Sequence, residues 1–131
     1  MNDHLVLISD GFGEAIDLDG DGVPEIIAMA YAGQNECGVY SFVSLQHWNG
    51  KIFVDDERRY VTSLSKAYPD DNVQLSAEKH YAVRIFGPGR VMLDDKEIAP
   101  GKPFTTEDDC HTIALHGGTA RTRAFLEELP Q

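Results

Sequence analysis

Residues 17–31 read Asp-Leu-Asp-Gly-Asp-Gly-Val-Pro-Glu-Ile-Ile-Ala-Met-Ala-Tyr, an acidic stretch that runs directly into an apolar one. Carboxylates stand at every second position from Asp17 to Asp21, and another follows at Glu25. Charges this crowded repel one another unless a cation lies between them, and oxygen ligands suit a hard cation such as Ca²⁺. The apolar run has strand length, and Pro24 suits the start of a strand. The stretch predicts a calcium loop that leads into a β-sheet.

The spacing of this loop differs from that of an EF-hand. An EF-hand has oxygen ligands at positions 1, 3 and 5, a glycine at position 6 and a bidentate glutamate at position 12. Here the first four conditions are met, but position 12 falls on Ala28 and the closing carboxylate, Glu25, comes at position 9. The alternative is a plain acidic turn, because Asp bonds its own backbone and Gly accepts positive φ.

The loop resembles the blade repeat of integrin-type β-propellers, the FG-GAP or VCBS family. The resemblance covers residues 12–54, from Phe12-Gly13 upstream to the alternating strand that ends in Trp48-Asn49-Gly50. In that family, side chains of the loop and one backbone carbonyl bind calcium. Carried over, the implied ligands are Asp17, Asp19, Asp21, Glu25 and the carbonyl of Val23. Because the motif occurs once, a whole propeller is excluded and a single blade is expected.

Length and charge limit the other possibilities. A chain of 131 residues suits one domain, with the calcium-loop half at 12–54 and further antiparallel strands at 55–131. The net charge of −11 argues against nucleic acid or anionic membranes as partners and favours cations or a basic protein. No apolar run approaches the roughly 18 residues that would insert into a membrane.

The two cysteines, Cys37 and Cys110, are far apart and have no metal-type spacing. They are either two buried thiols or one disulfide. Disulfides and calcium at millimolar levels both belong outside the reducing cytosol, so a periplasmic or secreted location is expected. No signal peptide is visible in Met1-Asn2-Asp3-His4, which lacks a basic region and a long apolar stretch.

Runs with a period of two, bounded by turn residues, recur along the chain, and no segment has a helical stripe. Asn49-Gly50 predicts a two-residue type I′ hairpin. Residues 63–77 read as a polar loop with at most one helical turn. The fold class expected is mainly β and antiparallel, a propeller-blade-like sheet or a small sandwich. The predicted strands are 5–9, 25–31, 38–48, 51–54, 58–62, 80–86, 90–93, 97–99, 112–115 and 122–129, the last ambiguous with a short helix.

No motif for catalysis occurs. The five histidines are scattered, and the chain has no nucleophile elbow, zinc-protease motif or phosphate-binding loop. Gly87-Pro88-Gly89-Arg90 and His116-Gly117-Gly118-Thr119 read as hairpin turns. The chain is therefore expected not to be an enzyme.

The chain as a whole resembles the periplasmic immunity proteins that protect bacteria against type VI secretion peptidoglycan amidases. This resemblance implies an inhibitor that plugs the active site of a basic cell-wall hydrolase. The loop expected to contact the hydrolase is 63–70, with Ser63, Ser65 and Tyr68 as contacts, and the second choice is the hairpin tip 87–90. The alternative function is a calcium-dependent adhesive or carbohydrate-binding module that uses exposed aromatic rings.

Overall fold

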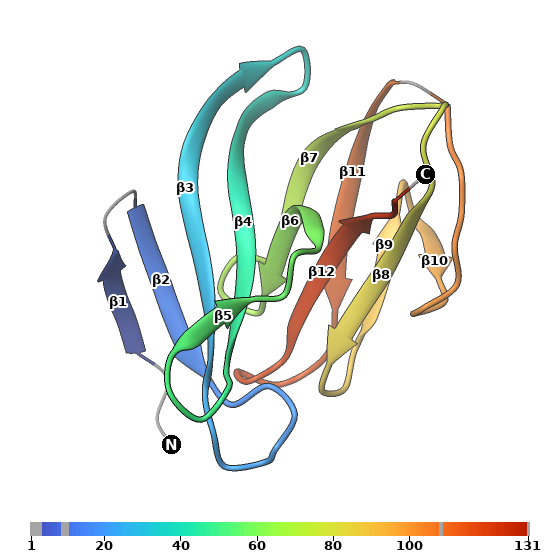
Figure 1. Ribbon diagram of the computed structural model, residues 1–131. Coiled ribbons are helices and arrows are strands. Elements are labelled where there is room, and N and C mark those ends of the chain that lie inside the picture. The colour runs from blue at the N-terminus through green and yellow to red at the C-terminus, as the bar shows by residue number, and fades with distance from the viewer. Residues whose placement is uncertain (1–3, 9–10, 108, 131) are drawn as a thin grey trace.

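The computed structural model describes residues 4–8, 11–107 and 109–130. Within these ranges every regular element is a strand and every strand pairing is antiparallel (Figure 1), which confirms the mainly β fold class. The strands are β1 His4–Ile8, β2 Gly11–Ile16, β3 Glu25–Asn35, β4 Gly38–Trp48, β5 Phe53–Asp55, β6 Arg59–Ser65, β7 Asp70–Leu75, β8 Tyr81–Phe86, β9 Arg90–Leu93, β10 Lys96–Ile98, β11 Asp109–His116 and β12 Arg123–Glu128.

The strands form two sheets. The large sheet has the order β1-β2-β3-β4-β6-β12-β8, with β5 paired to the end of β4, and the small sheet has the order β10-β9-β11-β7. The chain passes between the two sheets after β6, β7, β8 and β11. The large sheet takes strands from both the 12–54 and the 55–131 stretch, so the blade-like part does not stand alone. In the described residues no helix is long and apolar enough to cross a membrane.

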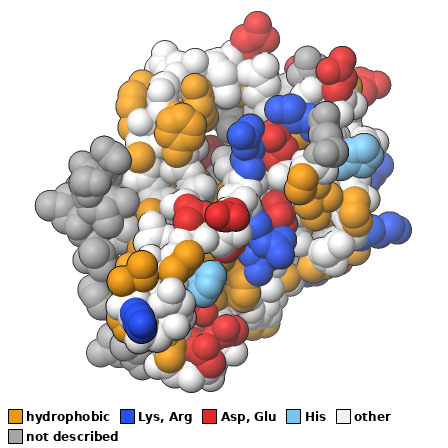
Figure 2. Space-filling view, in the orientation of Figure 1, with side chains coloured by type: hydrophobic (Ala, Val, Ile, Leu, Met, Phe, Trp, Pro, Cys, Tyr) orange, Lys and Arg blue, Asp and Glu red, His pale blue; other side chains and the backbone are white. Residues whose placement is uncertain are grey.

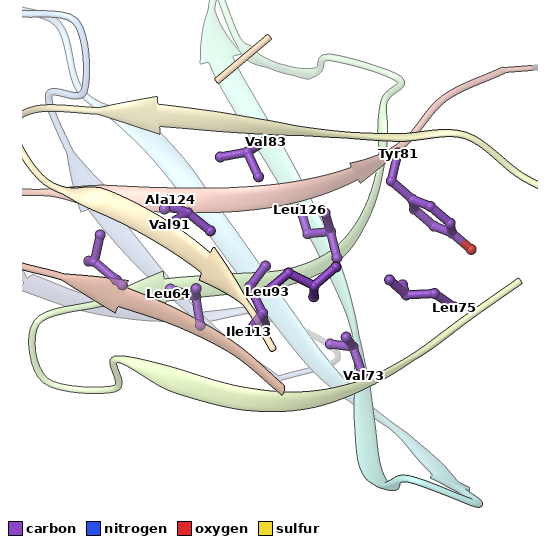
Figure 3. Packing of buried hydrophobic residues seen from close by; sticks show 11 residues of the cluster. Leu64, Val73, Leu75, Tyr81, Val83, Val91, Leu93, Ile113, Ala124 and Leu126 are labelled. Atoms are coloured by element: carbon purple, nitrogen blue, oxygen red, sulfur yellow. The ribbon is translucent and has the colours of Figure 1, made fainter. Parts of the chain in front are cut away.

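One hydrophobic core lies between the small sheet and the β6-β12-β8 part of the large sheet (Figure 3). Strand β12 contributes Ala124 and Leu126 to it, and the neighbouring β8 contributes Val83. Since successive side chains of a strand point to opposite faces, Phe125 lies on the other face of the large sheet. A second core is there, formed by Ile16, Ile27, Val43, Leu45, Tyr60 and Phe125.

The second core draws on five successive strands of the large sheet, β2, β3, β4, β6 and β12, and the sheet curls so far that the first and last of these also meet. Arg123 of β12 makes a two-pronged ion pair with Glu14 of β2, with Nε–Oε1 and Nη2–Oε2 distances of 2.7 and 2.8 Å. Strands β2 and β12 are separated in the sheet by β3, β4 and β6. The curl therefore brings the first and last parts of the chain together.

Three sequence predictions about strands were wrong. Gly11–Ile16 forms a strand that was not predicted. This strand leads into the acidic loop, in place of the predicted strand 5–9. Residues 63–65 belong to β6 and 70–75 form β7, where a polar loop with a possible helical turn was expected. Strand β7 alternates exposed polar residues with buried Val73 and Leu75, a period-two pattern that its polar content concealed. Met1–Asp3, on which the signal-peptide interpretation rests, and Ser9, the predicted end of the first strand, lie outside the described residues.

The predicted type I′ turn at Asn49-Gly50 was also wrong. Trp48 pairs with Phe53, so the loop spans 49–52. The carboxamide oxygen of Asn49 accepts hydrogen bonds from the amides of Lys51 and Ile52 (2.9 and 3.0 Å), which closes the longer turn.

The two-residue turn with positive φ at both positions lies instead at Asp94 and Asp95, with φ of 50° and 67°, between paired Leu93 and Lys96. The carboxylate of Asp94 accepts hydrogen bonds from the backbone amide of Thr112 (2.9 Å) and from Nδ1 of His111 (2.5 Å). Partial burial alone would lower the pKa of the His111 ring. The hydrogen bonds of the ring to Asp94 and to the carbonyl of Glu107 outweigh burial and raise this pKa. The pKa of Asp94 is lowered, chiefly by its hydrogen bond with His111.

These shifts give the hairpin a pH-dependent stability. Because the pKa of His111 is raised in the folded state, the protonated ring stabilises the fold. This contribution is complete at pH values below the unfolded pKa of about 6.5 and is lost as the pH rises through the folded pKa. The lowered Asp94 pKa stabilises above 3.8 and is lost as pH falls through the folded pKa. We expect His111→Gln to lower the free energy of unfolding by up to about 1 kcal/mol more at pH 5.5 than at pH 8.5. Urea unfolding at both pH values measures this, with the exposed His116→Gln on the same strand as control. An equal loss at both values would contradict it.

Candidate functional site

The acidic loop joins β2 to β3 and is held by its own carboxylates. Asp17 accepts hydrogen bonds from the amides of Gly20 (3.0 Å) and Gly22 (2.8 Å), both of which have positive φ. Glu25, at the first position of β3, accepts one from the amide of Leu18 (3.1 Å), whose side chain packs against the second core. The loop is therefore anchored at both ends, and it forms an acidic end of the molecule in Figure 2.

The four carboxylates converge. Asp17, Asp19, Asp21 and Glu25 each offer an oxygen atom, and these atoms lie within 4.8 Å of one another. Ligands of calcium lie at about 2.3–2.6 Å from the ion, so opposite ligands are roughly 5 Å apart. The spacing of the cluster thus fits one divalent cation. The residues predicted from spacing are brought together, and the cluster can hold a metal ion.

The electrostatics of the loop also favour a cation. Burial and the repulsion of Asp19, Asp21 and Asp17 raise the pKa of Glu25 to about 7, although the Leu18 amide opposes this. Asp17 behaves differently: desolvation would raise its pKa, but the hydrogen bonds from Gly22 and Gly20 outweigh this and lower it. Val23 lies between the carboxylates in the chain and donates its amide to Asp21 (2.8 Å). Its role as a carbonyl ligand stays a prediction.

The three predicted partner contacts lie around one cavity. Ser63 and Ser65 are half-buried on β6, and Tyr68 lies in the connection to β7 with 78% of its surface exposed. Together with Ile27 and Met29 of β3 they line a cavity of about 430 Å³, also lined by the Arg123–Glu14 ion pair. The exposed part of the predicted contact loop is therefore 66–70. Apolar surface surrounds Tyr68, which the polar sequence of this loop did not indicate.

The second-choice contact, the hairpin tip 87–90, packs against another turn. The hydroxyl of Thr122 donates to the carbonyl of Pro88 (2.8 Å) and accepts from the amide of Thr119 (3.0 Å). A Cβ at Gly118 would lie 2.7 Å from the Pro88 carbonyl, so glycine is required there. Both glycine-rich stretches are turns, and each supports the other.

Cys37 and Cys110 form a disulfide with Cα atoms 5.3 Å apart, which resolves the choice between thiols and a bridge. Cys37 lies at the tip of the β3–β4 hairpin and Cys110 near the start of β11, so the bond joins the large sheet to the small one.

The sequence did not show that a cluster of charged residues would form beside this hairpin. In it the Tyr60 hydroxyl donates to Asp56 (2.5 Å) and accepts from Arg84 (2.5 Å).

Three comparisons tested whether the chain is similar to known proteins. They covered protein-family models, curated proteins and solved structures, and none of them found a match.

Proposed function

We propose that the protein is a non-enzymatic inhibitor that works outside the cytosol, of the immunity type, and that it binds a cell-wall hydrolase, with a structural calcium ion in the acidic loop. The observation that carries the proposal is the position of Tyr68. Its ring is 78% exposed on the connection between β6 and β7, beside an apolar cavity that Ser63 and Ser65 help to line. Exposed aromatic side chains next to apolar pockets are typical of the energetic centres of protein interfaces.

The partner proposed is a basic peptidoglycan amidase of a type VI secretion system. The net charge of −11 would steer association with a basic enzyme and make the rate of association depend on salt. The disulfide joins the two sheets, and a rigid protein loses little entropy on binding. The identity of the ion as calcium rests on the all-oxygen donor set and on the FG-GAP resemblance.

The test is binding to purified amidases of this class, measured by calorimetry, together with their peptidoglycan hydrolysis. We expect inhibition by the wild type and a loss of about 2 kcal/mol, roughly thirtyfold in affinity, for Tyr68→Ala. Ile52→Ala, which truncates another exposed apolar residue, is the matched control. If no amidase is bound or inhibited the proposed function fails. If both variants bind equally well, the contact surface is not at Tyr68.

The second candidate is the calcium-dependent adhesive or carbohydrate-binding module. The observation that favours it is the exposure of Tyr31 and Phe42, each 70%, on the β3–β4 hairpin. A module of this kind would lose its ligand in chelator and regain it with calcium. If chelation lowers only the thermal stability, the ion is structural and the inhibitor proposal gains.

A further inference from the structure

A groove of about 580 Å³ lies between β4 of the large sheet and β7 of the small sheet. Its two walls are strand edges. Strand β7 is the last strand of the small sheet and pairs only with β11 in the described part of the chain. Strand β4 pairs with β6 at one position, Val43 with Tyr60, and with β5 further on. Within the described residues, therefore, no strand pairs with 38–42 on that edge.

The hydrogen-bond alternation shows which groups of β7 face the groove. In an antiparallel pair, every second residue exchanges hydrogen bonds with the partner strand and the others direct theirs away. The amide of Leu115 donates to the carbonyl of Pro69 (2.7 Å), directly before the first paired residue of β7. The odd-numbered residues of β7 therefore bond to β11, and Asn72 and Gln74 direct their amide and carbonyl groups to the free edge. Both residues line the groove.

The same argument applies to β4. The amide of Asp56 donates to the carbonyl of Leu45 (2.9 Å), so Leu45 directs its groups away from β3. By alternation Val43 and Ser41 do the same, and Val43 is the residue that pairs with β6. Ser41 thus presents its amide and carbonyl to the groove, which it lines.

The two edges differ in how they are protected. The amide of Asn72 is occupied by the carboxylate of its neighbour Asp71 (2.9 Å). For Ser41 and Gln74 the main-chain groups that face the groove point towards space in which another strand would lie. Exposed strand edges are templates for pairing with a further chain.

We infer that this groove binds an extended segment of another protein, which adds as a strand between the edges of β4 and β7. Main-chain hydrogen bonds to Ser41 and Gln74 would hold its backbone, as in other cases of strand addition. Tyr40 and Phe42, 40% and 70% exposed and stacked edge to face at 6.5 Å, provide an aromatic rim for its side chains. Figure 2 shows this side of the molecule, with hydrophobic side chains gathered over the β3–β4 hairpin.

The charges around the groove favour a segment with Lys or Arg. Asp55 and Glu57 are exposed in its lining. The basic residues that line it are already paired: Arg58 with Glu127 (3.0 Å) and Arg59 with Glu128 (3.4 Å). This site shares no residue with the cavity beside Tyr68 and goes beyond the proposed inhibition.

The test uses a phage-displayed library of random linear nonapeptides, selected on the intact oxidised protein. Gln74→Pro and Ser41→Pro each remove one amide that faces the groove without removing a hydrogen bond to β11 or β3, and Gln74→Ala and Ser41→Ala are the matched controls. We expect selected peptides to bind both alanine variants like the wild type and both proline variants roughly tenfold more weakly, as suits the loss of one hydrogen bond.

Hydrogen exchange on the wild type gives a readout that does not depend on the folding of the variants. The amides of Ser41 and Gln74 should exchange quickly in the free protein and slowly with a saturating selected peptide, while the amide of Val73, bonded to β11, stays slow in both. The inference is overturned if no peptide is selected, or if bound peptides leave the Ser41 and Gln74 amides unprotected. Since no amidase is present, these outcomes are independent of the proposed function.

Discussion

Asp19→Ala and Asp21→Ala should each abolish the stabilisation of the protein by calcium. A ligand that binds only the folded state adds RT ln(1 + [L]/Kd) to the free energy of unfolding, about 2.7 kcal/mol at a hundred times Kd. Both carboxylates belong to the cluster whose oxygen atoms lie within 4.8 Å of one another. Removing either takes away one ligand and one negative charge from the site. Thermal unfolding across a calcium titration, with calorimetry for binding, measures the effect.

In chelator the stabilities of these variants and of the wild type should be similar. Asp19 and Asp21 both repel Glu25 and contribute to its raised pKa of about 7. Without a cation, the relief of one repulsion offsets the loss of one hydrogen bond, from the Asp21 amide to Asp19 or from the Val23 amide to Asp21, so each variant should be about as stable as the wild type. The wild type should become the more stable protein only when calcium is added. Glu36→Ala, which removes an exposed carboxylate at the tip of the β3–β4 hairpin, is the control and should keep the full calcium response.

A wild-type response retained in both variants would place the calcium site elsewhere. A response lost in the Glu36→Ala control as well would show that calcium acts through the overall charge of −11 and not through this loop. The metal-ion proposal thus predicts that carboxylates of equal charge differ in their effect. Removing one from the loop should abolish the calcium response, and removing one outside the loop should not.

The acidic cluster could be predicted because its geometry is local. Alternating carboxylates and two glycines with positive φ form the loop from neighbours in sequence, so spacing alone indicated which side chains would meet. The antiparallel class could be predicted for the same reason, since period-two alternation is a property of each strand. The turns show the limit of local rules. Asn-Gly has the stronger preference for a two-residue hairpin turn, yet the side chain of Asn49 closes a longer loop. The two-residue turn forms at Asp94-Asp95 instead.

The relation between the two sheets could not be predicted, because it depends on contacts between distant residues. Nothing near Arg123 in the sequence indicates that it pairs with Glu14, and nothing near Ser41 indicates that β6 leaves β4 after one pair. Strand β7 was missed because only its pairing with β11 and the burial of Val73 and Leu75 distinguish it from a polar loop. The free strand edges arise from the same long-range arrangement.

Replacing both cysteines by serine should lower the free energy of unfolding by about 4 kcal/mol. The disulfide closes a loop of 73 residues between Cys37 and Cys110, and in the chain-entropy model a loop of this length restricts the unfolded chain by roughly that amount. The bond also joins the tip of the β3–β4 hairpin to β11, so it links the large sheet to the small one. Urea unfolding of the oxidised wild type and the Cys37→Ser/Cys110→Ser variant measures the loss.

Two controls separate the disulfide from other effects of the substitutions. Dithiothreitol should destabilise the wild type to the level of the double variant and leave the double variant unchanged. The calcium response should persist in the double variant, because the acidic loop lies at the other end of β3 from Cys37. A loss below about 1 kcal/mol on reduction would mean that the unfolded chain is already compact enough to keep the two cysteines close, since residual structure removes the entropic advantage. Loss of the calcium response would mean instead that the hairpin and the loop are coupled through β3.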